Sequence, residues 1–153
     1  KGVGPAKAIS ILAACELGKR RAMEKAQERT SIDSSKAIYE YLHPRMQDLD
    51  VEEAWIMLLN QHYKLIKAMA ISHGGITETA VDVRVILKEA LLSNATVLVL
   101  AHNHPSNHIQ PSKSDDQLTQ RVKKACEAVR IYFLDHVIVT DGTYYSYHDS
   151  GRL

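Results

Sequence analysis

The stretch ATVLVLAHNHPSNHIQPSKSDD, residues 95–116, passes from an unbroken apolar run to a polar segment. Residues 95–101 form a continuous apolar segment, which is typical of a strand at the centre of a sheet. Residues 101–116 then contain three histidines, two prolines, three serines and two aspartates, which are poor at packing a core. The stretch predicts either a polar loop that starts the next helix or a metal site built on a strand end.

The segments around this stretch predict a mixed domain of strands and helices. Alternation of apolar residues, helical periodicity and turn signals such as Asp141-Gly142 mark the elements. We therefore expect an α+β fold, with a largely antiparallel sheet flanked by helices. The expected elements, in chain order, are strands 53–60 and 64–72 as a hairpin, helix 79–94, strand 95–101, helix 112–130, and strands 131–140 and 143–148 as a second hairpin.

The N-terminal part of the chain differs in composition from the rest. Residues 1–30 carry seven Lys or Arg and three Glu, a net charge of +4, so the other 123 residues sum to −3. Pro5 suits the first position of a long helix. We expect residues 1–30 to form an N-terminal helical extension, 31–48 a helical connector and 49–153 the main domain. The connector helix should start near Asp33 and stop at His43-Pro44, because proline disfavours helix in the residue before it.

Composition excludes several classes of protein. The chain has 153 residues, 45% of them hydrophobic and 24% charged, which is ordinary for a globular protein. No apolar run approaches the ~18 residues that span a bilayer, and no signal peptide opens the chain, so we expect a cytoplasmic protein without a membrane partner. Cys15 and Cys126 are far apart, which predicts free thiols in a reducing compartment. Because the chain begins at Lys1, we interpret it as a fragment.

The residues after the apolar run offer a set of metal ligands. His102 and His104 lie two positions apart, so both side chains point to one side if the strand continues. Ser112 can start a helix whose first turn aims Asp115 back at the histidines. Two histidines and one carboxylate leave a fourth zinc position open, as catalytic zinc sites do. The non-metal interpretation is that Ser112 and Asp115 form a capping box and that H-x-H occurs by chance in a loop.

The same residues resemble a known family. His102-Asn103-His104-Pro105, six residues, Ser112, two residues and Asp115 fit H-x-H-P-x6-S-x2-D, the signature of the JAMM (MPN+) metalloproteases. KEALLSNATVLVLAHNHPSN, PSKSDDQLTQRVKKACEAV, LDHVIV and the terminal G-x-Y-Y-S-Y resemble the bacterial RadC branch, long called DNA repair proteins. The resemblance covers about residues 50–153 strongly and 1–30 moderately. It implies a JAMM/MPN-like (cytidine-deaminase-like) fold.

The resemblance also implies a role for each residue of the site. The two histidines and the aspartate of the signature would bind Zn2+. Ser112 would donate a hydrogen bond near the developing oxyanion. Glu52 would be the general acid and base, with Glu53 as its competitor, and alternation along a strand lets only one of them reach the site. Zinc-activated water beside such a carboxylate is suited to amide hydrolysis.

Two departures from the RadC pattern and one further histidine concern residues around the site. Asn107-His108 stands where glycine usually follows HNHPS; asparagine tolerates the left-handed backbone, so the turn can survive, and we interpret His108 as a loop residue. AVDVR replaces the usual HPRE, which affects contacts on the substrate side. His136 alternates with apolar neighbours, so we interpret it as structural or as a support for a metal ligand, rather than as a ligand.

The segment GVGPAKA resembles part of a helix-hairpin-helix DNA-binding element. Gly2 and Gly4 would let backbone N–H groups approach a phosphate at the start of the helix, and Lys7 would add charge. The first helix of such an element is missing, so we expect weak DNA binding at most.

Two functions from different classes follow from these observations. The first is a RadC-like, zinc-dependent metallopeptidase or isopeptidase, with a peptide or isopeptide substrate. The alternative is a non-catalytic, DNA-associated accessory protein of repair or mobile-element function, whose metal site is structural or vestigial. A nuclease is disfavoured, because the main domain is mildly acidic and phosphate contacts require Lys or Arg. The oligomeric state stays open.

Overall fold

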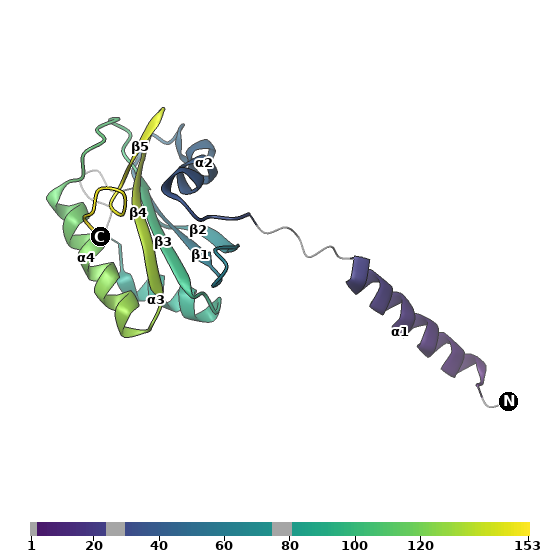
Figure 1. The fold of residues 1–153 in the computed structure, drawn as a ribbon. Coiled ribbons are helices and arrows are strands. Elements are labelled where there is room, and N and C mark those ends of the chain that lie inside the picture. The colour runs from purple at the N-terminus through teal and green to yellow at the C-terminus, as the bar shows by residue number, and fades with distance from the viewer. Residues whose placement is uncertain (1–2, 24–29, 75–80) are drawn as a thin grey trace.

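The computed structural model describes residues 3–23, 30–74 and 81–153, and the side chains of the first range up to Leu17. In these ranges five strands form one sheet in the order β2-β1-β3-β4-β5 (Figure 1). Among these five strands of the described ranges, only the β3–β4 pair is parallel. The predicted α+β fold is confirmed, and the apolar strand is central as expected. The strands are β1 (Glu53–Leu59), β2 (Leu65–His73), β3 (Val97–Asn103), β4 (Tyr132–Thr140) and β5 (Thr143–Ser146).

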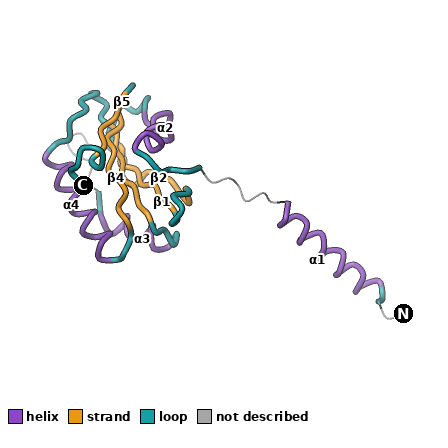
Figure 2. Tube along the Cα trace, in the orientation of Figure 1, coloured by secondary structure: helices purple, strands orange, loops and turns teal. Residues whose placement is uncertain are grey.

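Helices cover both faces of this sheet, as Figure 2 shows. One face packs against α2, and the other packs against α3 and α4. The expected helix 79–94 is shorter in the structure, because Asp82 caps its start by accepting a hydrogen bond from the Arg84 N–H; residues 79 and 80 lie outside the described part. The helices are α1 (Pro5–Met23), α2 (Ser35–Met46), α3 (Val83–Leu92) and α4 (Lys113–Ala128).

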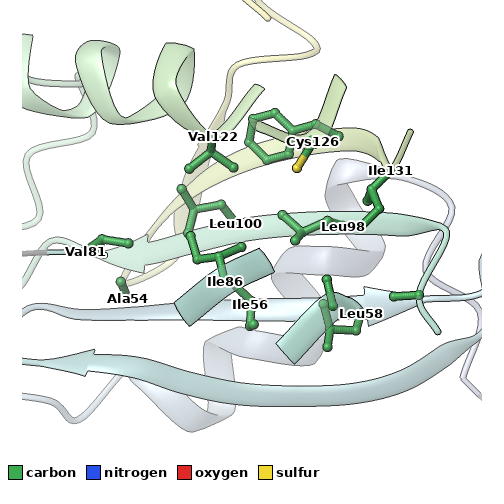
Figure 3. Close-up of a cluster of buried hydrophobic side chains, with 13 residues drawn as sticks. Ala54, Ile56, Leu58, Val81, Ile86, Leu98, Leu100, Val122, Cys126 and Ile131 are labelled. Carbon is green, nitrogen blue, oxygen red and sulfur yellow. The ribbon is translucent and has the colours of Figure 1, made fainter. Parts of the chain in front are cut away.

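The core between the sheet and the α3–α4 layer is built from alternate residues of the strands. Leu98 and Leu100 of β3 are fully buried beneath Val122 and Cys126 of α4 (Figure 3). Burial raises the pKa of the Cys126 thiol to about 11, so this cysteine is an inert apolar group. Because side chains alternate along a strand, the next residue of β3 on this face is His102.

The opposite face of the same strands packs against α2. Val97, Val99 and Ala101 of β3 are buried in one cluster with Ile38 and Leu42 of α2. The next residue of β3 on this face is Asn103, which is 3% exposed. The end of β3 therefore divides its polar residues between the two faces: His102 points to the side of α4 and Asn103 to the side of α2.

Helix α2 was expected to stop at His43-Pro44. It continues to Met46, so that prediction was wrong. Pro44 lies close to the C-terminal end, where its missing N–H removes a single helical bond. The Gln47 N–H still donates to the His43 carbonyl, at 2.9 Å. Met46 is 2% exposed within the core. The apolar contacts of the last turn thus offset the local cost of the proline.

The N-terminal helix α1 begins at Pro5, the position expected from the sequence. Figure 1 shows α1 apart from the sheet and from the helices that cover it. Ile9 and Leu12 of α1 are exposed. Cys15 and Cys126 are both free, as predicted. None of the helices in the described ranges is long and apolar enough to cross a membrane.

Candidate metal centre

The histidines of the site lie where β3 leaves the sheet. His102 pairs with Ala54 of β1 in the antiparallel ladder, and it is 5% exposed. His104 follows at the strand exit, and its backbone N–H donates to the carbonyl of Val139 at 3.0 Å. Asn107 then reverses the chain in the left-handed conformation, with φ 57°, as the sequence predicts. Both histidines are thereby fixed at one end of the sheet, on the side of α4.

Asp115 reaches the histidines from the first turn of α4. The Ser112 hydroxyl accepts a hydrogen bond from the Asp115 N–H at 3.1 Å, and Asp115 Oδ2 accepts one from the Ser112 N–H at 2.7 Å. This reciprocal pair is a capping box, so the non-metal interpretation of Ser112 and Asp115 describes real geometry. It does not exclude a metal, because the carboxylate also faces both imidazoles.

Three potential ligand atoms converge at this point. His102 Nε2 lies 3.0 Å from His104 Nε2 and 3.2 Å from Asp115 Oδ1. His104 Nε2 lies 3.7 Å from Asp115 Oδ2. All three residues present a ligand atom within 4.8 Å of the other two. Two nitrogens and a carboxylate oxygen at such spacing can share one ion, and this donor set suits zinc.

The other ring nitrogen of each histidine already has a partner. His104 Nδ1 contacts the backbone carbonyl of His108 at 2.5 Å, and His102 Nδ1 contacts His136 Nε2 at 2.8 Å. A carbonyl can only accept, so His104 Nδ1 carries a proton, and Nε2 is the nitrogen that is turned towards the site. Metal-binding histidines are held in this way, by an acceptor behind the ring.

Charge within the trio of His102, His104 and Asp115 also favours the binding of a cation. Burial alone would raise the pKa of Asp115, but hydrogen bonds with His102 and His104 hold it well below its usual range. Burial alone would lower the pKa of His104, but its bonds with Asp115 and the His108 carbonyl outweigh that effect and raise it. The carboxylate is therefore ionised at neutral pH, and it attracts positive charge to the point where the ring nitrogens meet.

The trio opens into a cavity of about 790 Å³. Glu52 and Ser112 line this cavity together with the trio. Glu53, the competitor, is held on the other side of β1: its carboxylate accepts from Trp55 Nε1 at 2.9 Å and contacts His73 Nδ1. Of the two glutamates, the structure thus places Glu52 at the candidate site, while its catalytic role stays a prediction.

A residue inside the motif fixes the backbone on both sides of Glu52. The Asn103 side chain accepts from the Glu53 N–H at 2.7 Å and donates to the Val51 carbonyl at 3.0 Å. In addition, the Glu52 carbonyl accepts from the Gly74 N–H at 2.9 Å. Sequence analysis did not single out Asn103, since an amide between two histidines carries no signal of its face until the strand direction is known.

Thr119 is a second residue that sequence analysis missed. It is fully buried, and its hydroxyl contacts His136 Nδ1 at 2.6 Å and the Asp115 carbonyl at 2.7 Å. The available signal was its position four residues after Asp115, which places it on the same face of α4. His136, interpreted from the sequence as structural or as a support for a ligand, does contact His102.

The structure describes three of the four remaining predicted residues. Gly2 falls outside the described residues. Gly4 and Lys7 are exposed at the start of α1, so the DNA contact expected there stays a prediction. His108 lines the cavity, and its backbone carbonyl is the atom that serves the site.

The fold and the arrangement of this site define a JAB/MPN-like domain. The RadC-like JAB domain family matches residues 32–152 of the chain, and the chain belongs to that family. The match includes residues 32–48 of the segment expected to be a connector, where α2 packs on the sheet.

Whole-chain comparisons agree with this membership. The chain is 44% identical over 154 residues to a UPF0758 protein of Porphyromonas gingivalis, covering 100% of the chain and 68% of the relative. It is 44% identical over 151 residues to a UPF0758 protein of Flavobacterium johnsoniae, covering 99% of the chain and 66% of the relative. The chain thus spans about two thirds of the length of these relatives.

Proposed function

We propose that this chain is a zinc-dependent hydrolase that cleaves peptide or isopeptide bonds. The observation that carries the proposal is the convergence of His102, His104 and Asp115 in a cavity that Glu52 also lines. Membership of the RadC-like JAB domain family fits a metal-dependent hydrolase, and the family resemblance supplies the expected reaction. A site that only stabilises a fold has no need for a carboxylate beside an open cavity.

The zinc ion, when bound, would lower the pKa of a water molecule towards ~7 and polarise the carbonyl of the substrate. His102, His104 and Asp115 would hold it through Nε2, Nε2 and a carboxylate oxygen. The Glu52 carboxylate would accept the proton of the attacking water and pass it to the nitrogen of the leaving amine. Breaking the C–N bond of the amide then releases an amine and a carboxylic acid.

Ser112 has a proton available for the reaction. Its hydroxyl oxygen accepts the bond from the Asp115 N–H, and its single proton can still be donated into the cavity that Ser112 lines. Donation towards the developing oxyanion would stabilise the tetrahedral state more than the planar carbonyl. Capping of α4 and stabilisation of an oxyanion are thus compatible uses of one side chain.

The neighbouring glutamates provide a matched test. Glu52→Gln and Glu53→Gln make the same chemical change one residue apart, on opposite sides of β1. Zinc content of the wild type and both variants would be measured by elemental analysis, and hydrolysis would be measured by mass spectrometry on libraries of peptides and of lysine-linked isopeptides. We expect about one zinc per chain in all three proteins, and hydrolysis that is lost in Glu52→Gln alone.

Other outcomes contradict the proposal in different ways. A wild type that binds no zinc after zinc is supplied excludes the metal hydrolase. Zinc binding with equal hydrolysis in the wild type and Glu52→Gln excludes Glu52 as the proton carrier. Zinc binding with no cleavage in either library excludes peptide and isopeptide bonds as substrates.

A further inference from the structure

His136 lies behind the candidate metal centre, where the proposed reaction makes no use of it. Its side chain is fully buried, and it stacks on Tyr147 with ring centroids 5.0 Å apart. One ring nitrogen contacts His102 at 2.8 Å, and the other contacts the Thr119 hydroxyl at 2.6 Å. Burial disfavours the charged form of an imidazole, so this fully buried ring is neutral and carries one N–H proton.

The contacts of Thr119 determine which nitrogen carries that proton. The hydroxyl has one proton, and it lies 2.7 Å from the Asp115 carbonyl and 2.6 Å from His136 Nδ1. A carbonyl oxygen can only accept, so the hydroxyl donates to Asp115 and must accept from His136. His136 is therefore protonated on Nδ1, and its Nε2 is a bare acceptor.

The same reasoning determines which atom donates in the hydrogen bond between His136 and the proposed ligand His102. Since His136 Nε2 is an acceptor, His102 Nδ1 must donate to it across the 2.8 Å contact. With Nδ1 as the donor to His136, Nε2 of His102 is the nitrogen left to bind a metal at the point where His104 and Asp115 converge. The opposite direction would protonate His102 on Nε2, the atom that has to bind the metal.

We propose that Thr119 and His136 are positioning residues that fix the tautomer of His102 and so prepare its Nε2 to bind zinc. The inference rests on the proposed function for its purpose, but the direction of the protons is a property of the metal-free protein. We call the chain of hydrogen bonds from Thr119 through His136 to His102 the relay. It also couples α4 to β3, because Thr119 donates to the backbone of Asp115, itself a proposed ligand. The ligand on β3 and the ligand on α4 are thus oriented by one buried chain of hydrogen bonds.

The test uses a pair of substitutions that differ in one hydroxyl. Thr119→Val removes the acceptor for His136 Nδ1 and keeps a branched side chain, whereas Thr119→Ser keeps the hydroxyl. Two-bond ¹H–¹⁵N spectra of the metal-free proteins at mildly alkaline pH distinguish Nδ1–H from Nε2–H in each histidine. Zinc affinity would be measured by competition with a chromophoric chelator. Cys126→Ala, which changes a buried apolar side chain on the same helix and touches none of these hydrogen bonds, is the control.

We expect Nδ1–H on His136 in the wild type, Thr119→Ser and Cys126→Ala. In Thr119→Val we expect that preference to be lost and zinc affinity to fall by about 10- to 100-fold, as for other partners of ligand histidines. Nε2–H on His136 in the wild type overturns the inference without any variant. So does a Thr119→Val protein that keeps wild-type tautomers and zinc affinity, or a Thr119→Ser protein as impaired as Thr119→Val.

The spectra also separate this inference from the proposed function. If the wild type binds no zinc, the hydrolase proposal fails, while the tautomers of the metal-free protein still decide the relay. If zinc binds and peptides are cleaved but His136 carries Nε2–H, the relay is wrong and the hydrolase proposal stands.

Discussion

His102 and Asn103 are neighbours at the end of β3, yet they belong to opposite faces of the sheet. His102 faces α4 and meets the other proposed ligands within 3.2 Å. Asn103 faces α2 and bonds the backbone on both sides of Glu52. The alternation of a single strand thus separates the chemistry of the site from the scaffold that aligns it. The difference teaches that substitutions on the two faces should damage different properties of the protein.

The largest effect is expected on the site face. His104→Ala removes one of three ligands, so zinc affinity should fall more than the roughly 100-fold that loss of a supporting partner can cause. Zinc at a hundred times its Kd should stabilise the wild type by about 2.7 kcal/mol and should not stabilise the variant. His104 borders the cavity, so the free energy of unfolding of the metal-free variant should be within about 1 kcal/mol of that of the metal-free wild type. Elemental analysis and denaturant unfolding measure both quantities.

His108→Ala is the matched control for this substitution. It removes a second imidazole from the same cavity but keeps the backbone carbonyl that contacts His104. Zinc content should therefore stay at the wild-type value. Loss of zinc in His108→Ala, or its retention in His104→Ala, would show that the wrong histidine has been assigned as a ligand.

The next effect is expected on the scaffold face. Asn103→Leu leaves the Glu53 N–H without its buried acceptor and the Val51 carbonyl without its donor, which should lower the free energy of unfolding by about 2–4 kcal/mol. The variant should still gain the full increment of stability on adding zinc, because the ligands lie on the other face. Denaturant unfolding with and without zinc checks both statements. Asn103→Asp, which keeps an acceptor for the Glu53 N–H, should lose less.

One outcome for Asn103→Leu would contradict the comparison between the two faces of β3. A destabilised protein that also fails to bind zinc in Asn103→Leu would mean that the two faces are not independent. Hydrolysis adds a finer distinction, because Asn103 fixes the backbone around Glu52. Asn103→Leu should therefore lose hydrolysis while it retains zinc.

Much of this architecture could be predicted from local sequence. The apolar run 95–101 has no charged residue, so its central place in the sheet followed from burial alone. The left-handed conformation of Asn107 followed from the tolerance of asparagine for it. Spacing and family resemblance together selected His102, His104 and Asp115, and the structure brings these three residues together, although zinc binding itself stays a prediction.

The rest required knowledge of contacts between distant segments. The helix through Pro44 continues because Met46 is buried, which no local rule for proline includes. The bonds of Asn103 with residues about fifty positions earlier depend on the register of β1 with β3. Thr119 looks like an ordinary polar residue on a helix until the parallel pairing of β3 with β4 places His136 between it and His102.

The smallest effect is expected at Ser112, which caps α4 and is also proposed to stabilise the oxyanion. Ser112→Ala removes the cap of α4, which should lower the free energy of unfolding by about 1 kcal/mol, and Ser112→Thr should restore most of it. Asp115 then loses the bond from its N–H to the Ser112 hydroxyl but keeps the one that its carboxylate accepts from the Ser112 N–H. Zinc affinity should consequently change much less than in His104→Ala, while hydrolysis should fall if the hydroxyl also stabilises the oxyanion. Parallel measurement of unfolding, zinc affinity and hydrolysis separates the two functions, because a residue that is only a cap would change hydrolysis no more than it changes zinc binding.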